Sequence, residues 1–240
     1  MSEEKKIVSG NDLEEDGELT LFEGQPFSGI CCNYSKNGKK DHETYYRDGK
    51  REGPDIEWYI KGQKSQGYYK DGKEDGVWTT WYKDGEKQSR KFYKNGKLNG
   101  NQTEWYEDGQ KKYKRHYKDG KEDGLWTGWY KSGKKRSERN WKEDGVSTCW
   151  YENRQKKSEV HCKDGKEHGL WISWYENGKK EREGNLKDGE FDGLWINWYE
   201  NGKKKVEKHY KDGKEDGLWT EWDEDGKKTF QGNFVNGNEQ

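Results

Sequence analysis

The sequence predicts an all-β protein, an elongated antiparallel meander of tandem β-hairpin repeats that forms a single twisted or curled sheet. Three observations support this fold class. A glycine recurs about every 24 residues, turn-forming Asn-Gly or Asp-Gly dipeptides recur with it, and aromatic residues stand at fixed distances after it. A fixed spacing of about 20 to 50 residues is the signature of a repeat architecture. We therefore expect about nine repeats along the chain.

The repeats are defined by the glycine that opens each of them. The nine opening glycines are Gly29, Gly53, Gly76, Gly100, Gly124, Gly145, Gly169, Gly193 and Gly217. Residues 1–28 precede them as an irregular leader or degenerate cap, and residues 29–240 form the array, whose last repeat is itself a cap. The step from Gly124 to Gly145 is short because the usual KDGKEDG shrinks to KEDG there. We expect a trimmed turn at Lys142–Gly145.

Each repeat carries two turn signals, which set the length of its strands. Asn177-Gly178 exemplifies one set and Asp188-Gly189 the other. Both dipeptides tolerate the positive φ angles of the two-residue type I′ turn that joins antiparallel strands. Turns about every twelve residues predict two strands in each repeat and leave no room for helices.

The composition indicates how such a chain folds and which partners it lacks. Charged residues make up 40% of the chain and hydrophobic residues only 26%, but 14 Trp, 16 Tyr and 6 Phe can bury a large area from few positions. The 47 basic residues nearly balance the 48 acidic residues, so we expect neither nucleic acid nor a membrane as a partner. The N-terminal segment has no apolar stretch of secretory type, which predicts a cytoplasmic protein.

Alternation along a strand divides each repeat between two faces of the sheet. Five residues after the opening glycine the column is aromatic, and three residues after it the column is small or β-branched. One residue after it the column is mostly aliphatic, with Val77, Leu125, Val146, Leu170, Leu194 and Leu218. We call this the first-position face and expect it to be the core.

The opposite, second-position face begins two residues after each opening glycine. Its leading column reads Cys31, Asp55, Trp78, Gln102, Trp126, Ser147, Trp171, Trp195 and Trp219. Asp, Gln and Ser would be costly in a closed core, so we expect this column to be at least partly wet. We also expect rings to lie across the recurrent glycines, where missing side chains leave backbone to cover. The predicted partner-binding residues are Trp126, Trp171, Tyr175, Trp195, Tyr199 and Trp219.

The residue types that carry catalysis or bind metals are scattered. Cys31, Cys32, Cys149 and Cys162 have no CxxC spacing, and we expect reduced thiols. His161 and Cys162 are neighbours on one strand and so point to opposite faces. We predict no catalytic residues, no cofactor and no metal site.

The Gly, Trp-Tyr, Asn-Gly and Asp-Gly landmarks of segments such as GLWISWYENGKKEREGNLKDGEFD (residues 169–192) resemble the MORN-repeat variant, as it occurs in bacterial YwqK-type antitoxins. The resemblance covers residues 29–240. It implies β-hairpin arrays that curve into a grooved sheet used for protein contacts and, in eukaryotic relatives, proposed to touch membranes. The sequence departs from the pattern at Pro54-Asp55, at the glycine-free turn Asn153-Arg154, and at Asp55, Gln102 and Ser147.

These observations predict a non-enzymatic scaffold that binds another protein through its Trp and Tyr side chains, which are preferred interface anchors. The partner could be a toxin, in which case the chain would act as an antitoxin or immunity protein. Two alternatives remain open: an aromatic platform for carbohydrate, and a module that associates with membrane lipid. End-to-end self-association of terminal repeats also remains open.

Overall fold

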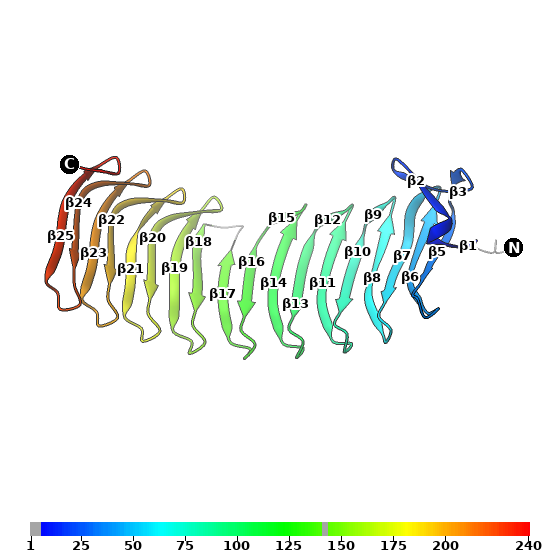
Figure 1. The fold of residues 1–240 in the computed structure, drawn as a ribbon, viewed down its shortest axis with the longest axis horizontal. Helices are drawn as coiled ribbons and strands as arrows, with labels where there is room; N and C mark the ends of the chain where they lie inside the picture. Colours follow the sequence, from blue (N-terminus) through cyan, green and yellow to red (C-terminus); the bar gives the residue numbers. More distant parts are fainter. Residues whose placement is uncertain (1–5, 141–143) are drawn as a thin grey trace. The chain divides into compact units, whose positions relative to one another are not determined.

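A computed structural model of the protein describes residues 6–140 and 144–240, which belong to two compact units (Figure 1). The N-terminal unit ends at Glu122 and the C-terminal unit begins at Asp123, one residue before the opening glycine of the fifth repeat. The described residues contain one 3-10 turn, η1 (Gly10–Asp12), and no α-helix. No helix among them has the length and apolarity to cross a membrane.

The strands of the N-terminal unit are β1 (Ile7–Ser9), β2 (Leu13–Asp16), β3 (Leu19–Phe22), β4 (Gln25–Pro26), β5 (Gly29–Tyr34), β6 (Lys40–Arg47), β7 (Lys50–Trp58), β8 (Gln63–Lys70), β9 (Lys73–Glu74), β10 (Gly76–Trp81), β11 (Lys87–Lys94), β12 (Lys97–Leu98), β13 (Gly100–Trp105), β14 (Lys111–Lys118) and β15 (Lys121–Glu122). The strands of the C-terminal unit are β16 (Leu125–Trp129), β17 (Lys135–Asn140), β18 (Gly145–Trp150), β19 (Lys156–Lys163), β20 (Lys166–Trp174), β21 (Lys180–Lys187), β22 (Glu190–Trp198), β23 (Lys204–Lys211), β24 (Lys214–Trp222), β25 (Lys228–Val235) and β26 (Asn238–Glu239).

Both units are antiparallel meanders in which consecutive strands pair. In the N-terminal unit β5, β6, β7 and β8 follow one another in this way, and β8 pairs on with β10. In the C-terminal unit the pairing runs without interruption from β16 to β26. The predicted all-β hairpin meander is therefore confirmed.

The segment before the first repeat folds into strands of its own. Strand β1 pairs with β5 in parallel, and β2, β3 and β4 form a separate three-stranded antiparallel sheet. Val8, Phe27 and Cys31 form a small buried cluster on which Leu13 and Phe22 pack. This segment therefore adds apolar contacts to the first repeat.

The turns of the Asp188-Gly189 set have the predicted geometry. Asp188 and Gly189, like the equivalent pairs in other repeats, both have positive φ angles, 54° and 94°. Two consecutive positive φ angles define the type I′ turn, whose twist matches that of the flanking strands.

The turns of the Asn177-Gly178 set differ from the prediction, because they are longer than two residues. Tyr175 N donates to Lys179 O, and Gly178 N donates to Tyr175 O. Of Asn177 and Gly178, only Gly178 has a positive φ angle, 84°. This is a type I turn followed by a left-handed residue. The side-chain Oδ1 of Asn177 accepts a hydrogen bond from Lys179 N at 3.0 Å, and a register shift between Ser173 and Trp174 accommodates the extra residue.

The two irregular turns of the middle repeats have different outcomes. Arg154 keeps the turn of its repeat, since Arg154 N donates to Tyr151 O, but it occupies the left-handed position with φ 74°. The trimmed turn predicted at Lys142–Gly145 lies largely outside the described residues; of it, Gly145 opens β18 and Asp144 Oδ1 accepts from Asp164 N at 3.0 Å.

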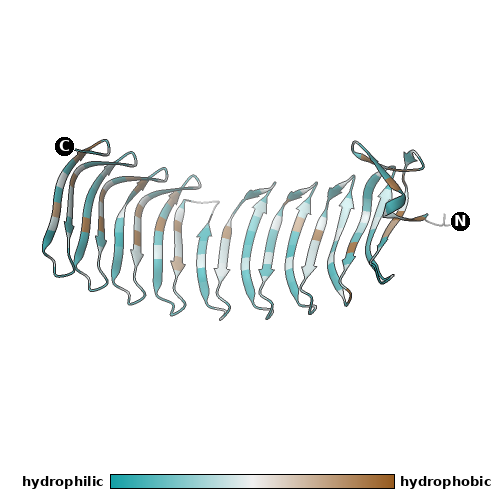
Figure 2. Cartoon of the chain, viewed as in Figure 1, coloured by the Kyte–Doolittle hydropathy of each residue, from teal (hydrophilic) through white to brown (hydrophobic). Residues whose placement is uncertain are grey.

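The distribution of buried residues corrects the predicted core in part. The aliphatic column of the first-position face is exposed, with Leu125 at 51%, Leu194 at 39% and Leu218 at 43%. On the same face, the column three residues after the glycine includes the buried Cys32, Thr127 and Thr220. Leading residues of the opposite face are buried as well: Cys31, Asp55, Gln102 and Trp195 are between 5% and 7% exposed. Figure 2 shows apolar residues as isolated bands on mostly hydrophilic strands. The expectation that the first-position face alone forms the core was therefore wrong, because both faces contribute buried residues and the aliphatic column does not.

The physical reason lies in the neighbours across the sheet. Leu170 and Leu194 stand opposite the polar residues Asn185 and His209, which offer them little apolar surface. A tryptophan ring on the other face can instead lie over a glycine of the preceding strand, and one such contact buries the ring and the backbone together.

We expect Arg154→Gly to stabilise the protein by about 1 kcal/mol, because a residue with a Cβ pays that penalty in the left-handed region and glycine does not. Urea unfolding midpoints of wild type and variant measure the change. The converse substitution, Gly178→Ala at the equivalent turn, should destabilise by a similar amount. Equal midpoints for all three proteins would contradict this explanation.

Candidate functional site: the tryptophan row of the C-terminal unit

The leading residues of the second-position face form one row with the residues opposite them. In the C-terminal unit the pairs are Trp126 with Arg139, Ser147 with Val160, Trp171 with Gly184, Trp195 with Lys208, and Trp219 with Gly232. We call this set of residues the tryptophan row. Because paired residues of neighbouring strands point to the same face, each large ring has a smaller or flexible neighbour beside it.

Trp195 is the most enclosed ring of the row. It lies against Gly184 of the preceding strand, where an added Cβ would stand only 2.2 Å from its Cδ2. Its Nε1 donates a hydrogen bond to Asn185 O at 2.9 Å, and the residue is 7% exposed. In the N-terminal unit Trp78 covers Gly67 in the same manner. These two glycines are not among the recurrent glycines for which the sequence predicts a covering ring; of those, Gly29 has the Phe27 ring and Gly53 the Tyr45 ring where a side chain would project.

Other aromatic and apolar residues complete a cluster around Trp195. Val160, Cys162 and Leu186 are buried with it, and Trp171 and Tyr210 pack against the cluster. The Phe191 ring centroid lies 4.2 Å from that of Trp195. These contacts fix the orientation of the Trp195 ring.

Trp219 has a cation on one side and phenylalanines around it. The Lys208 ammonium lies 3.3 Å from the Trp219 ring centroid, a short cation–π contact. Phe234 and Phe230 lie 4.8 and 5.7 Å from the ring, and Nε1 donates to Glu221 Oε1 at 3.0 Å. Phe230 also stands where a side chain on Gly232 would project, so it covers the glycine that ends the row.

The predicted tyrosines are engaged with the following repeat. Tyr175 OH donates to Trp198 O at 2.7 Å, and Tyr199 OH donates to Trp222 O at 2.9 Å. The same bond recurs at Tyr59, Tyr82, Tyr130 and Tyr151. Within each unit, these tyrosine side chains therefore link successive repeats through backbone carbonyl groups.

The six predicted partner-binding residues thus occupy different environments. Trp195 is buried, Trp126, Trp171 and Trp219 are half-buried, and Tyr175 and Tyr199 are half-buried with their hydroxyls bonded. The structure brings Trp171 and Trp195 into contact, with ring centroids 5.5 Å apart. Their role in binding a partner stays a prediction.

A cavity of about 150 Å³ opens beside Trp195. Its lining combines aromatic, aliphatic and cationic side chains: Arg182, Phe191, Trp195, Asn197, Val206, Lys208 and Tyr210. Sequence reasoning singled out only Trp195 among them. The others could have been found by pairing the strands, since Lys208 stands opposite Trp195, and Asn197 stands opposite both Arg182 and Val206.

The electrostatics of this cavity depend on an acidic neighbour. Glu215 Oε1 lies 3.6 Å from the Lys208 ammonium, and burial together with Glu215 raises the pKa of Tyr210 above its ordinary value of 10.0. The phenol therefore stays protonated at neutral pH.

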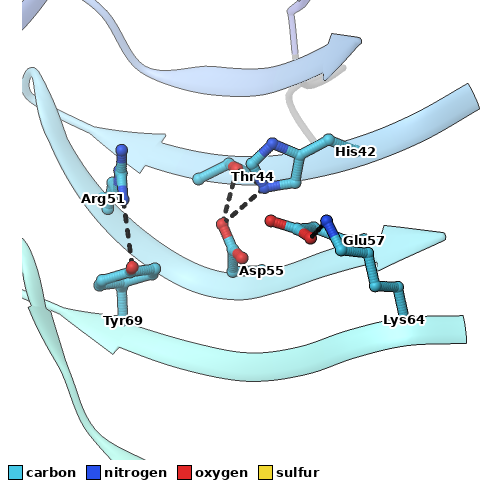
Figure 3. Close-up of polar contacts among 7 residues, drawn as sticks. All are labelled: His42, Thr44, Arg51, Asp55, Glu57, Lys64 and Tyr69. Carbon is cyan, nitrogen blue, oxygen red and sulfur yellow. Dashed lines mark hydrogen bonds and ion pairs between the residues drawn. The ribbon is translucent and has the colours of Figure 1, made fainter. Parts of the chain in front are cut away.

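In the N-terminal unit a polar cluster stands where other repeats carry a ring (Figure 3). Asp55, with a side chain only 7% exposed, accepts a hydrogen bond from Thr44 Oγ1 at 2.7 Å and lies 3.0 Å from His42 Nε2. Glu57 pairs with Lys64 at 2.7 Å beside it. A buried carboxylate is tolerated here because it is hydrogen-bonded.

The cysteines and the neighbouring histidine behave as the sequence predicts. All four cysteines are free thiols, and burial raises the pKa of Cys31, Cys32 and Cys162. Cys162 is buried while His161 is exposed. The two side chains therefore do not form a nucleophile and base pair.

These features define a class, the tandem β-hairpin repeat protein in which each repeat is completed by contacts from the next. The sequence model of the MORN repeat variant matches residues 74–95, 98–119, 122–143, 167–188, 191–212 and 215–236, which is more than half of the chain. The chain belongs to the MORN repeat variant family. A comparison with curated proteins gives no match.

The three repeats outside these matches open at Gly29, Gly53 and Gly145. Each of them lacks tryptophan at the second position, yet each forms the same hairpin, β5–β6, β7–β8 and β18–β19. Family membership indicates a repeat-based binding scaffold.

We expect Trp195→Ala to lower the free energy of unfolding by about 3 kcal/mol, since it removes a buried ring and uncovers Gly184. Leu194→Ala, on the same strand but the opposite face, should cost no more than about 1 kcal/mol because Leu194 is 39% exposed. Chemical denaturation of both variants provides the comparison. A larger loss from Leu194→Ala would show that the first-position face carries the core.

The His42–Asp55 contact predicts a pH-dependent contribution to stability. Asp55 raises the pKa of His42 above its ordinary value of 6.5, so the contribution is complete below pH 6.5 and is lost as the pH rises through the higher folded-state pKa. The free energy of unfolding of wild type minus that of His42→Gln, measured from about pH 5.5 to 8.5, should therefore fall with increasing pH. A difference that is constant or rises would contradict the assignment.

Proposed function

We propose that the chain is a non-enzymatic scaffold that binds another protein through the second-position face of its C-terminal unit. The observation that carries the proposal is the cavity beside Trp195. At about 150 Å³ it is smaller than the pockets of about 300 to 1,000 Å³ that hold small molecules, and it suits a single side chain. Anchor side chains of this kind dominate protein interfaces.

The composition of the cavity fits a protein interface. Trp, Tyr and Arg are the residue types that contribute most to binding energy at interfaces, and Trp195, Tyr210 and Arg182 line it together. The Trp195 ring is fixed by Gly184 and by its hydrogen bond to Asn185, so a partner would lose little free energy in ordering it.

The other two classes of partner have less support. Carbohydrate stacking requires an open ring face, but Trp195 lies against Gly184 on one side and has the Phe191 ring 4.2 Å away. Lipid binding is favoured by an excess of basic residues, and the chain has a formal net charge of −1.

An antitoxin or immunity role is the finer form of the proposal, and the resemblance of the repeats to those of YwqK-type antitoxins is its support. It requires the partner to be a toxin. A cytoplasmic location would suit such a role and is proposed with it.

The test uses Arg182→Glu, which reverses a charge at the cavity and leaves the buried rings in place. Because the Arg182 side chain is 54% exposed, we expect the variant to fold. Tagged wild type and variant are used to capture proteins from the lysate of the source organism, and affinity for a purified partner is then measured. We expect Arg182→Glu to weaken binding at least tenfold. To test toxicity, the partner is expressed in cells with and without the chain, and the growth of the two cultures is compared.

Arg47→Glu is the matched control, since Arg47 is an arginine of the N-terminal unit whose side chain is 72% exposed. It should retain the partner. A partner bound equally by all three proteins would place the interface elsewhere, and failure to capture any protein would contradict the scaffold proposal.

A further inference from the structure

The chemistry of the cavity beside Trp195 indicates the kind of group that fits it. Phe191, Trp195, Val206 and Tyr210 provide an apolar wall, while Arg182 and Lys208 provide two positive charges and Asn197 an amide. A group bound there must bring apolar surface and should bring negative charge, because an uncharged group would leave the cations without a new partner.

The nearby acidic residues are already engaged. Glu215 Oε1 lies 3.6 Å from the Lys208 ammonium, which also sits over the Trp219 ring. Glu181 Oε2 accepts a hydrogen bond from Ser173 Oγ at 3.0 Å, and its other oxygen lies 3.9 Å from Arg182 Nε, beyond hydrogen-bond distance. Arg182 therefore keeps donors for a planar anion.

The repeat pattern shows that Arg182 is not required by the fold. The equivalent residues of the C-terminal unit are Ser137, Ser158, Val206 and Phe230, each opposite the fourth residue after an opening glycine. The residue opposite Val206 is Asn197, whereas the other repeats carry Gly128, Cys149, Ser173 or Glu221 at that position. The Arg182–Asn197 pair is therefore a local departure in hairpins that form equally well without it.

We propose that this cavity binds a carboxylate carried on an apolar stem, as presented by an acidic side chain or the carboxyl terminus of a partner protein. The stem packs against Phe191 and Trp195, and the carboxylate accepts hydrogen bonds from the Arg182 guanidinium beside the positive charge of Lys208. This inference rests on the proposed scaffold function and specifies the chemistry of its anchor.

A titration with a minimal probe tests the carboxylate directly. The indole N–H signals of the 14 tryptophans are followed by ¹H–¹⁵N NMR in the full-length protein while 3-phenylpropanoate is added, and 3-phenylpropanamide serves as the neutral isostere. We expect a saturable shift of the Trp195 signal with the acid, and affinity about tenfold lower with the amide, which cannot form the charge-assisted bond.

Arg182→Gln isolates the guanidinium without altering the apolar wall, and Arg47→Gln, at a 72% exposed arginine of the N-terminal unit, is its control. The first should remove the preference for the acid, and the second should preserve it. Equal binding of acid and amide, an unchanged preference in Arg182→Gln, or no shift of Trp195 at millimolar probe would overturn the proposal.

The two proposals fail in different ways. A partner that is lost with Arg182→Glu, together with a cavity that does not prefer the acid, would leave the scaffold function standing and remove the carboxylate. A cavity that prefers the acid, in a protein that captures no partner, would leave a small anion site and remove the scaffold function.

Discussion

The packing of the C-terminal unit depends on one constraint: a single layer of sheet has no second layer to pack against, so its side chains must be buried by neighbours in the same sheet. A large ring that lies across a glycine meets this requirement, because the glycine has no side chain to displace, and Trp195 lies over Gly184 in this way. The result is a shallow core. Among the described residues no large side chain is less than 2% exposed. Stability must therefore accumulate from contacts between adjacent repeats, as in other solenoid proteins.

The same constraint explains how the departures from the repeat are accommodated. In the N-terminal unit, where the second position of one repeat is Asp55, polar groups take the place of the ring, and Asp55 is satisfied by Thr44 and His42. Where a strand glycine has no following ring, as at Gly232, Phe230 of its own strand folds over it. The row is thus a set of complementary neighbours, and the cavity beside Trp195 opens where Arg182 stands in place of the smaller or apolar residues of the other repeats.

The period, the hairpins and the turns of the Asp188-Gly189 set could be predicted from sequence, because glycine-containing dipeptides favour the positive φ angles of hairpin turns. The burial of the two faces could not. It depends on which residue stands opposite, and Leu194, opposite His209, stays exposed. The turns of the Asn177-Gly178 set were misjudged because Asn177 bonds its own loop and allows one more residue. Of the cavity lining only Trp195 was anticipated, since Arg182 and Asn197 meet through strand register, which the repeat period does not reveal.

Within each unit the tyrosine hydroxyl bonds join one repeat to the one after it, with donor and acceptor 23 residues apart for Tyr175 and Trp198. Loss or gain of one complete repeat would recreate the same bond at the new junction, whereas loss of a single strand would exchange the two faces of everything beyond it. Identical phrases such as KDGKEDGLW at Lys118 and Lys211 are the kind of sequence between which a repeat can be gained or lost in register. The number of repeats can thus change during evolution without a change in the contacts between them. Each added repeat also adds a position at which a local departure can create a binding cavity.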